Sequence, residues 1–167
     1  MPATKKRTEV HGTWLTPESF YKSLNERFDF SDFDPCPPDC DLSKFNGLAV
    51  DWADRTFFNP PYDLPTKTAF VRKALEQSKQ CSLIVGLLPA STGGALFHEV
   101  IRPHFSIEFL RGRLPFEGID KTGLWCNPLA GGYGKAAKAW RERHIMPGQE
   151  GENRSGQVDL MLIIIGE

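Results

Sequence analysis

The chain has 167 residues, 40% hydrophobic and 25% charged, a balance typical of a globular protein that buries its own core. Its 20 Lys and Arg residues against 21 Asp and Glu residues give a net charge of −1, which excludes a uniformly basic nucleic-acid coat. No apolar run is long enough to cross a membrane, and the charged residues 1–9 lead into no apolar segment. We therefore expect a single domain over residues 1–167, in the cytoplasm and without a membrane partner.

Helix and strand signals alternate from the first quarter of the chain onward. Thr16-Pro17 predicts the N-cap and first position of a helix. One face of that helix carries Phe20, Leu24 and Phe28. We then predict a strand over Phe28–Asp34, ended by Pro35, and a short apolar strand over Arg55–Phe58.

The middle of the chain continues the alternation. Pro65 begins a predicted helix with the apolar face Phe70, Val71, Ala74 and Leu75. The apolar run Ser82–Leu88 has the length of a strand that is buried on both faces. Ser91/Thr92 then caps a predicted helix that ends before Pro103 and carries Leu96, Phe97, Val100 and Ile101.

Two further strands, Phe105–Leu110 and Val158–Ile165, complete the pattern. Helices that separate apolar strands predict an α/β fold of three layers, with a mainly parallel sheet between helices. In such sheets ligands bind beyond the carboxyl ends of the strands. Asp34-Pro35-Cys36 and Asn59–Tyr62 follow two predicted strands, so we expect the functional site there.

Charge and glycine are distributed unevenly. Residues 29–54 hold seven aspartates and the single base Lys44, whereas residues 121–147 hold five bases and the single acid Glu142. Eight of the 15 glycines lie between Gly118 and Gly156. We interpret residues 118–156 as a basic, glycine-rich insertion, with one short helix near residues 135–143.

The four cysteines form no paired C-x2-C pattern, and the four histidines are scattered. We therefore interpret the cysteines as reduced thiols and expect no metal. A zinc site that uses Cys36 and Cys40 is an alternative, but the chain has no matching second half.

Asn59-Pro60-Pro61-Tyr62 is the motif that points most directly to chemistry. Two consecutive prolines hold the backbone in a fixed turn, which presents the Asn59 side-chain carbonyl and the Pro60 backbone carbonyl as nearby acceptors. Tyr62 adds an aromatic face and a polar tip. Together they suit a planar ring that carries an NH2 group, and two acceptors on its hydrogens direct the nitrogen lone pair toward an electrophile. An Asn59 and a Tyr62 turned away from open space would argue against this use. The plainer alternative is a structural turn.

This motif, in this position, resembles motif IV of the amino-methyltransferases that use S-adenosylmethionine. The chain as a whole resembles the short phage-type DNA N6-adenine methyltransferases. The resemblance rests on five segments in the order Trp14-Leu15-Thr16-Pro17, Asp34-Pro35-Cys36, Gly47-Leu48 with Asp51-Trp52, Asn59–Tyr62, and Arg111–Phe116. It implies an abbreviated Rossmann-like methyltransferase sandwich, located in the host-cell cytoplasm if a phage encodes it.

The resemblance also implies residue roles. Asn59, Pro60 and Tyr62 would bind and activate the target adenine, and Pro61 would hold the turn. Cofactor contacts would come from Trp14, Thr16, Pro17, Asp34, Pro35, Cys36, Asp51 and Trp52. For Trp14 and Trp52, core filling is the alternative, and for Asp51 it is a solvated loop position. The family's usual glycine after the first strand is missing, because Asp34-Pro35-Cys36 runs into Pro37-Pro38.

Duplex DNA is the expected partner. An adenine inside a duplex must be flipped out before its amine can react. We expect the DNA phosphates to be bound by basic side chains near the end of a predicted strand and in the insertion: Arg111, Arg113, Lys121, Lys135, Lys138, Arg141 and Arg143. The predicted reaction is direct transfer of the sulfonium methyl group to N6. The alternatives are a methyltransferase-like module that binds DNA without catalysis, and an enzyme that methylates RNA adenine or a protein glutamine.

Overall fold

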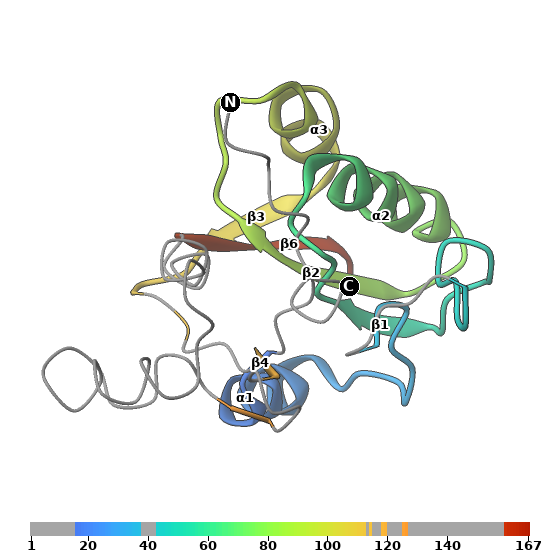
Figure 1. Cartoon of the computed structure of the whole chain (residues 1–167). Coiled ribbons are helices and arrows are strands. Elements are labelled where there is room, and N and C mark those ends of the chain that lie inside the picture. The colour runs from blue at the N-terminus through green and yellow to red at the C-terminus, as the bar shows by residue number, and fades with distance from the viewer. Residues whose placement is uncertain (1–15, 38–42, 113, 115–117, 120–124, 127–158) are drawn as a thin grey trace, which may run out of the picture.

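A computed structural model gives the structure of the chain and describes residues 16–37, 43–112, 114, 118–119, 125–126 and 159–167. Its central sheet has four strands in the order β1-β2-β6-β3 (Figure 1). These are β1 (Arg55–Phe58), β2 (Leu83–Pro89), β6 (Leu160–Gly166) and β3 (Ser106–Phe109). Two short strands, β4 (Gly118–Ile119) and β5 (Trp125–Cys126), pair separately. Four predicted strands are thus confirmed. The predicted ranges Arg55–Phe58, Ser82–Leu88 and Phe105–Leu110 correspond to β1, β2 and β3, and the predicted Val158–Ile165 corresponds, from residue 160, to β6.

The sheet is mixed, and the prediction of a mainly parallel sheet is wrong in its pairing. Among the described strands, only β1 and β2 pair in parallel, and β6 is antiparallel to both β2 and β3. Strands β1, β2 and β3 therefore run in one direction, with β6 reversed between β2 and β3. An apolar run buried on both faces reads the same in either direction, so the pattern of Val158–Ile165 could not reveal this reversal.

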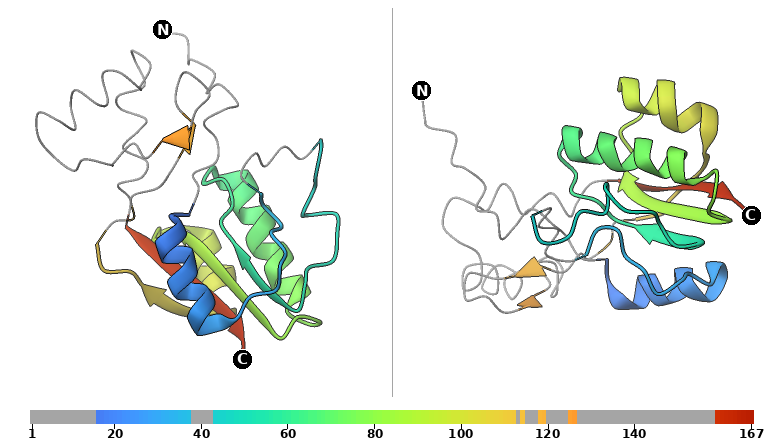
Figure 2. Two further views of the ribbon diagram at one scale, coloured as in Figure 1. Left: turned by 90° about the horizontal axis from the view of Figure 1, so that it is seen from below. Right: turned by 90° about the vertical axis from the view of Figure 1, so that its right-hand side faces the viewer.

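Helices cover both faces of the sheet, which confirms the three-layer α/β prediction. Helix α1 (Glu18–Phe28) lies on one face, and α2 (Leu64–Gln77) and α3 (Arg102–His104) lie on the other (Figure 2). Neighbouring residues of β1 point to opposite faces. Phe57 joins the core cluster that includes Leu24 of α1, whereas Phe58 joins the cluster that includes Phe70 of α2.

The start of α1 differs by one residue from the prediction. Pro17, not Thr16, is the N-cap, and no side chain caps the helix. Leu24 and Phe28 are buried on the predicted face. Asp29 ends the helix in a left-handed conformation, with φ of 50°, and its N–H donates to the Asn25 carbonyl.

The predicted strand Phe28–Asp34 is wrong. Phe28 is the last residue of α1, and residues 29–37 contain no strand. Its backbone makes other hydrogen bonds in place of a regular strand pairing. The Asn25 side chain accepts from the Phe30 N–H, and the Ser31 N–H donates to the Arg55 carbonyl. Capping by a short polar side chain competes with strand pairing in this way.

Helix α2 begins as predicted. The Asp63 carboxylate accepts from the Thr66 N–H at 3.0 Å, and Pro65 occupies the first turn, where the helix needs no N–H from it. Phe70, Val71 and Ala74 are fully buried. The short helix thus connects β1 to its parallel neighbour β2, as a parallel pair requires.

The helix after β2 is placed differently from the prediction. It is a π-helical segment, η2 (Leu96–Ile101), that continues directly into α3. Its N-cap is Ala95 without a side-chain hydrogen bond, so the predicted Ser91/Thr92 cap is wrong. Pro103 lies inside α3 and not beyond the helix, because it occupies the first turn of the α-helical segment.

One glycine of the parallel pair makes room for an aromatic ring of the neighbouring strand. A Cβ on Gly86, in the middle of β2, would lie 2.5 Å from the Phe58 ring. The ring occupies the space that a side chain would need, so this position requires glycine.

In the described part of the chain, no helix is long and apolar enough to cross a membrane.

Candidate active site

The Asn59–Tyr62 turn begins where β1 ends, at the carboxyl end of the parallel pair. Asn59 is buried, with 8% of its surface exposed, and Pro60 is buried as well. The Asn59 Nδ2 atom donates a hydrogen bond of 3.2 Å to Thr16 Oγ1. Thr16 stands immediately before α1, so the start of that helix is joined to the turn.

Tyr62 lies further inside than a base-stacking residue is expected to lie. Its ring packs against the core cluster on the α1 face, which includes Leu24 and Phe57. Burial of the hydroxyl raises the pKa of Tyr62 far above its ordinary value, so the phenol keeps its proton at all ordinary pH values. The residue is only partly buried, and the predicted stacking of its ring on a substrate stays a prediction.

A cavity of about 270 Å³ lies on the α1 face of the sheet, and no residue of the Asn59–Tyr62 turn lines it. Its lining includes three carboxylates, three aromatic rings and one hydroxyl, from Glu18, Asp32, Asp34, Tyr21, Phe33, Phe57 and Thr16. Because Thr16 also accepts from Asn59, one residue connects the cavity to the turn. The cavity therefore attracts a positively charged group that carries a flat or apolar part.

Two residues that line the cavity, Asp34 and Tyr21, have raised pKa values. Shielding from water raises the pKa of Asp34, and the hydrogen bond of 2.8 Å from the Cys36 N–H opposes that effect. Burial raises the pKa of Tyr21, and the charges of Asp34 and Asp32 raise it further. A cation in the cavity would relieve this concentration of negative charge.

The Asp34-Pro35-Cys36 loop packs tightly against a glycine from another segment. A Cβ on Gly47 would lie 1.9 Å from the Pro35 carbonyl oxygen, so only glycine fits there. Cys36 is buried in the core beside this contact. Gly47 therefore lets its own backbone pack against that of Pro35, which holds the loop in place.

Trp52 lies in the core, which is the alternative to a cofactor contact that the sequence left open. It is 5% exposed, and its ring contacts Phe58 and Phe70. Its indole Nε1 atom donates to the Gly47 carbonyl at 2.8 Å. Trp52 thus holds the glycine against the Pro35 loop, and a direct contact with a cofactor stays a prediction.

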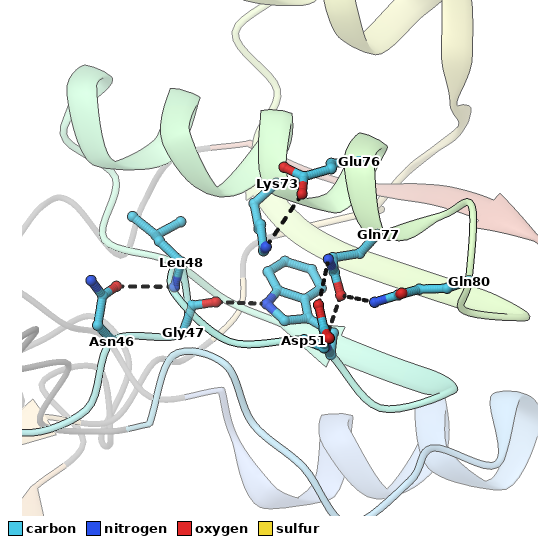
Figure 3. Close-up of polar contacts among 9 residues, drawn as sticks. Asn46, Gly47, Leu48, Asp51, Lys73, Glu76, Gln77 and Gln80 are labelled. Carbon is cyan, nitrogen blue, oxygen red and sulfur yellow. Dashed lines mark hydrogen bonds and ion pairs between the residues drawn. The ribbon is translucent and has the colours of Figure 1, made fainter.

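Gln77 is a structurally important residue that the sequence reasoning missed. It is 3% exposed, and its Oε1 atom accepts from the Trp52 N–H at 2.7 Å. Figure 3 shows Gln77 between Asp51, whose carboxylate accepts from Gln77 Nε2, and Gln80. Asp51 itself is exposed. The signal was available, because Gln77 stands seven residues after Phe70, on the buried face of α2.

Most of the predicted DNA contacts fall outside the described residues. Arg111 follows β3 and is exposed. The residues outside are Trp14, Arg113, Lys121, Lys135, Lys138, Arg141 and Arg143. The same holds for the predicted helix near residues 135–143 and for most of the insertion. Within the described ranges, no group of three or more His, Cys, Asp or Glu side chains could hold a metal ion.

Comparison with known proteins identifies the family. A family model described as DNA N-6-adenine-methyltransferase (Dam) matches residues 3–124, well over half of the chain. No curated protein matches the chain. No solved structure matches it either. The matched range includes the turn, the acid-lined cavity and the loop held by Gly47. The chain therefore belongs to the Dam family and is an enzyme that methylates the N6 atom of adenine in DNA.

Proposed function

We propose that the Asn59–Tyr62 turn and the acid-lined cavity together transfer a methyl group from S-adenosylmethionine to an adenine that has been flipped out of DNA. The observation that supports this assignment is the hydrogen bond between Thr16 and Asn59, since it joins the cavity to the turn. When bound, S-adenosylmethionine supplies the activated methyl group on a sulfonium. The residues of the chain supply binding, orientation and exclusion of water.

The lining of the cavity fits this cofactor. Its methionine part carries an ammonium and a sulfonium cation, which the carboxylates of Glu18, Asp32 and Asp34 would attract. The rings of Phe33 and Phe57 offer flat apolar surface to the adenine part. We propose Thr16, Pro17, Asp34, Pro35 and Cys36 as the cofactor contacts, with Asp51, Trp52 and Trp14 as the sequence predicts.

The turn would hold the target amine. Because Asn59 Nδ2 donates to Thr16, the amide is fixed in one orientation, and Oδ1 occupies the opposite branch. Oδ1 and the Pro60 carbonyl would accept the two N6 hydrogens, while Pro61 keeps the turn rigid. These hydrogen bonds strengthen as positive charge develops on N6, so they favour the transition state over the ground state.

The flipped base needs a stacking surface and the strand needs cations. We propose Tyr62 as the stacking partner; because its ring packs on the core here, it would have to turn outward when DNA binds. Base stacking on an aromatic ring is worth about 1–3 kcal/mol, which offsets part of the cost of flipping. The phosphates would be contacted by Arg111 and by the other predicted basic side chains, Arg113, Lys121, Lys135, Lys138, Arg141 and Arg143.

One experiment tests these steps together. The protein is incubated with S-adenosylmethionine labelled in its methyl group and with unmethylated duplex DNA, single-stranded DNA or RNA, and the digested nucleosides are analysed by mass. We expect labelled N6-methyladenine from DNA. Saturable cofactor binding without transfer to any nucleic acid would contradict the proposal and favour a binding module. Label in RNA alone would contradict the DNA assignment.

A further inference from the structure

A second cavity, of about 240 Å³, lies on the other face of the sheet, between α2 and η2 at the carboxyl end of β2. Its walls are largely apolar and include Leu88, Phe97, Ile101 and Met161. Leu64, on its rim, follows the Asn59–Tyr62 turn and the Asp63 cap directly in the chain. The carboxyl ends of strands are where α/β proteins bind ligands, and this cavity stands at that edge beside the turn.

The cavity contains a buried lysine. Lys67, in the first turns of α2, lines the cavity and is only 9% exposed. Within the described part of the chain its ammonium makes no hydrogen bond or ion pair. The nearest acid, Asp63, already accepts from the Thr66 N–H as the cap of α2. Burial lowers the pKa of Lys67, and Asp63 offsets this only in part.

An anion in the cavity would compensate the charge of this ammonium. The other charged side chains that line the cavity are Arg72 and Glu99, which are both exposed. Two cations and one acid leave the cavity with a positive balance. The lining therefore combines a site for an anion with an apolar wall and one aromatic ring.

We propose that this cavity binds one nucleotide, with its phosphate on the Lys67 ammonium and its base against the wall formed by Leu96, Phe97 and Met161. A lysine binds phosphate as a point charge, and a base stacks on an aromatic ring without regard to sequence. The choice of a nucleotide rests on the DNA substrate of the family, and the position beside the turn suits a residue of the strand that carries the target. A free nucleotide has the same chemistry.

The test uses the full chain and a probe that the adenine site does not recognise. Binding of 5′-dTMP and of thymidine is measured by calorimetry for the wild type, Lys67→Met, Lys67→Arg and Lys79→Met. Lys79 is an exposed lysine just beyond α2, so its variant controls for the loss of one positive charge. We expect saturable binding of 5′-dTMP, with thymidine at least about tenfold weaker.

Lys67→Met should weaken 5′-dTMP binding about tenfold or more, Lys67→Arg should retain most of it, and Lys79→Met should leave it unchanged. The melting temperature of ligand-free Lys67→Met should stay the same or rise, because a buried charge is replaced by an apolar chain of similar size. Equal 5′-dTMP affinity in the wild type and Lys67→Met overturns the proposal. A lower melting temperature with unchanged affinity also overturns it, because it assigns Lys67 to the fold.

A competition arm separates the two sources of the nucleotide. Displacement of 5′-dTMP by a thymidine oligonucleotide in the wild type supports a nucleotide of the DNA strand, whereas displacement by mononucleotides alone supports a free nucleotide. Methyl transfer to DNA is measured in parallel. Transfer that persists without Lys67-dependent binding overturns the cavity assignment alone, and Lys67-dependent binding without any transfer contradicts the proposed function alone.

Discussion

The amide of Asn59 is the smallest unit on which the proposed chemistry depends. Asn59→Ala removes both the acceptor for the target amine and the contact with Thr16. We expect the rate of methyl transfer to fall about 100-fold or more, as loss of a single transition-state hydrogen bond does in other enzymes. Single-turnover rates measured with saturating DNA and cofactor test this expectation.

Variants of Thr16 provide the matched control for Asn59→Ala. Thr16→Ser keeps a hydroxyl that accepts from Asn59 Nδ2 and should retain most of the rate, whereas Thr16→Val should lose part of it. Circular dichroism checks that each variant is folded. An Asn59→Ala enzyme that is folded and nearly as fast as the wild type would refute the role given to the turn.

The ionised carboxylate of Asp34 lowers the stability of the ligand-free protein. Because shielding raises the pKa of Asp34, the folded protein binds its proton more tightly than the unfolded chain does, so the ionised form lowers stability as pH rises through that interval. Asp34→Asn, which can still accept from the Cys36 N–H, should raise the melting temperature of the ligand-free protein at pH 7. The gain should vanish at acid pH, where Asp34 is protonated.

The affinity for S-adenosylmethionine should fall in this variant, because it lacks one of the carboxylates that we propose attract the cofactor's cations. Thermal melting across a pH series and calorimetric titration with S-adenosylmethionine measure the two effects. An Asp34→Asn protein that melts lower at pH 7 than the wild type would show that the carboxylate supports the fold.

At the scale of elements, an exposed ion pair joins α1 to β3. Arg27 donates two hydrogen bonds, of 2.8 and 2.6 Å, to the Glu108 carboxylate, and this contact lowers the pKa of Glu108. The stabilisation is present above the ordinary pKa of a glutamate and is lost as pH falls through the lowered value. Glu108→Gln should reduce the free energy of unfolding at pH 7 by no more than about 1 kcal/mol, because both side chains are exposed.

Urea unfolding at two salt concentrations and at two pH values tests this estimate. The difference between Glu108→Gln and the wild type should shrink in high salt and disappear at acid pH. A loss that is independent of salt would mean that Glu108 acts through packing.

Most elements could be predicted because their signals are local. A helix is indicated by Pro65 together with the apolar positions of α2, and a buried strand is indicated by the unbroken apolar run of β2. The irregular segment after Phe28 could not be predicted from its own residues. Its N–H groups donate to the Asn25 side chain and to the Arg55 carbonyl, and neither contact leaves a mark in the apolar pattern. The placement of Thr16 next to Asn59 likewise depends on a contact between residues 43 positions apart.

The candidate site was predictable in composition and not in geometry. The Asn59–Tyr62 turn and the Asp34 loop were found from their residue types, but Gln77, Gly47 and Lys67 act through burial, which emerges only when the layers meet. Tyr62 shows the same limit, since an aromatic ring after a turn can face either the core or a ligand.

For the molecule as a whole, β6 is the strand that completes the sheet. It lies between β2 and β3, and Leu160, Met161, Leu162 and Ile163 are almost fully buried. A chain that stops before Leu160 should therefore lose cooperative unfolding, because two strand edges and both core clusters are left open. Calorimetry and binding of a dye specific for exposed apolar surface measure this loss. A cooperative transition in the shortened chain would contradict the central role of β6.

The position of β6 also bears on synthesis at the ribosome. Strands β2 and β3 leave the exit tunnel well before their common neighbour, so the nascent chain has to keep two facing edges apart while some 50 intervening residues are translated. Those edges are the kind of surface that trigger factors and Hsp70-type chaperones shield. The sheet can thus close only after β6 has been translated, and a nascent chain interrupted before Leu160 would lack the strand that joins β2 to β3.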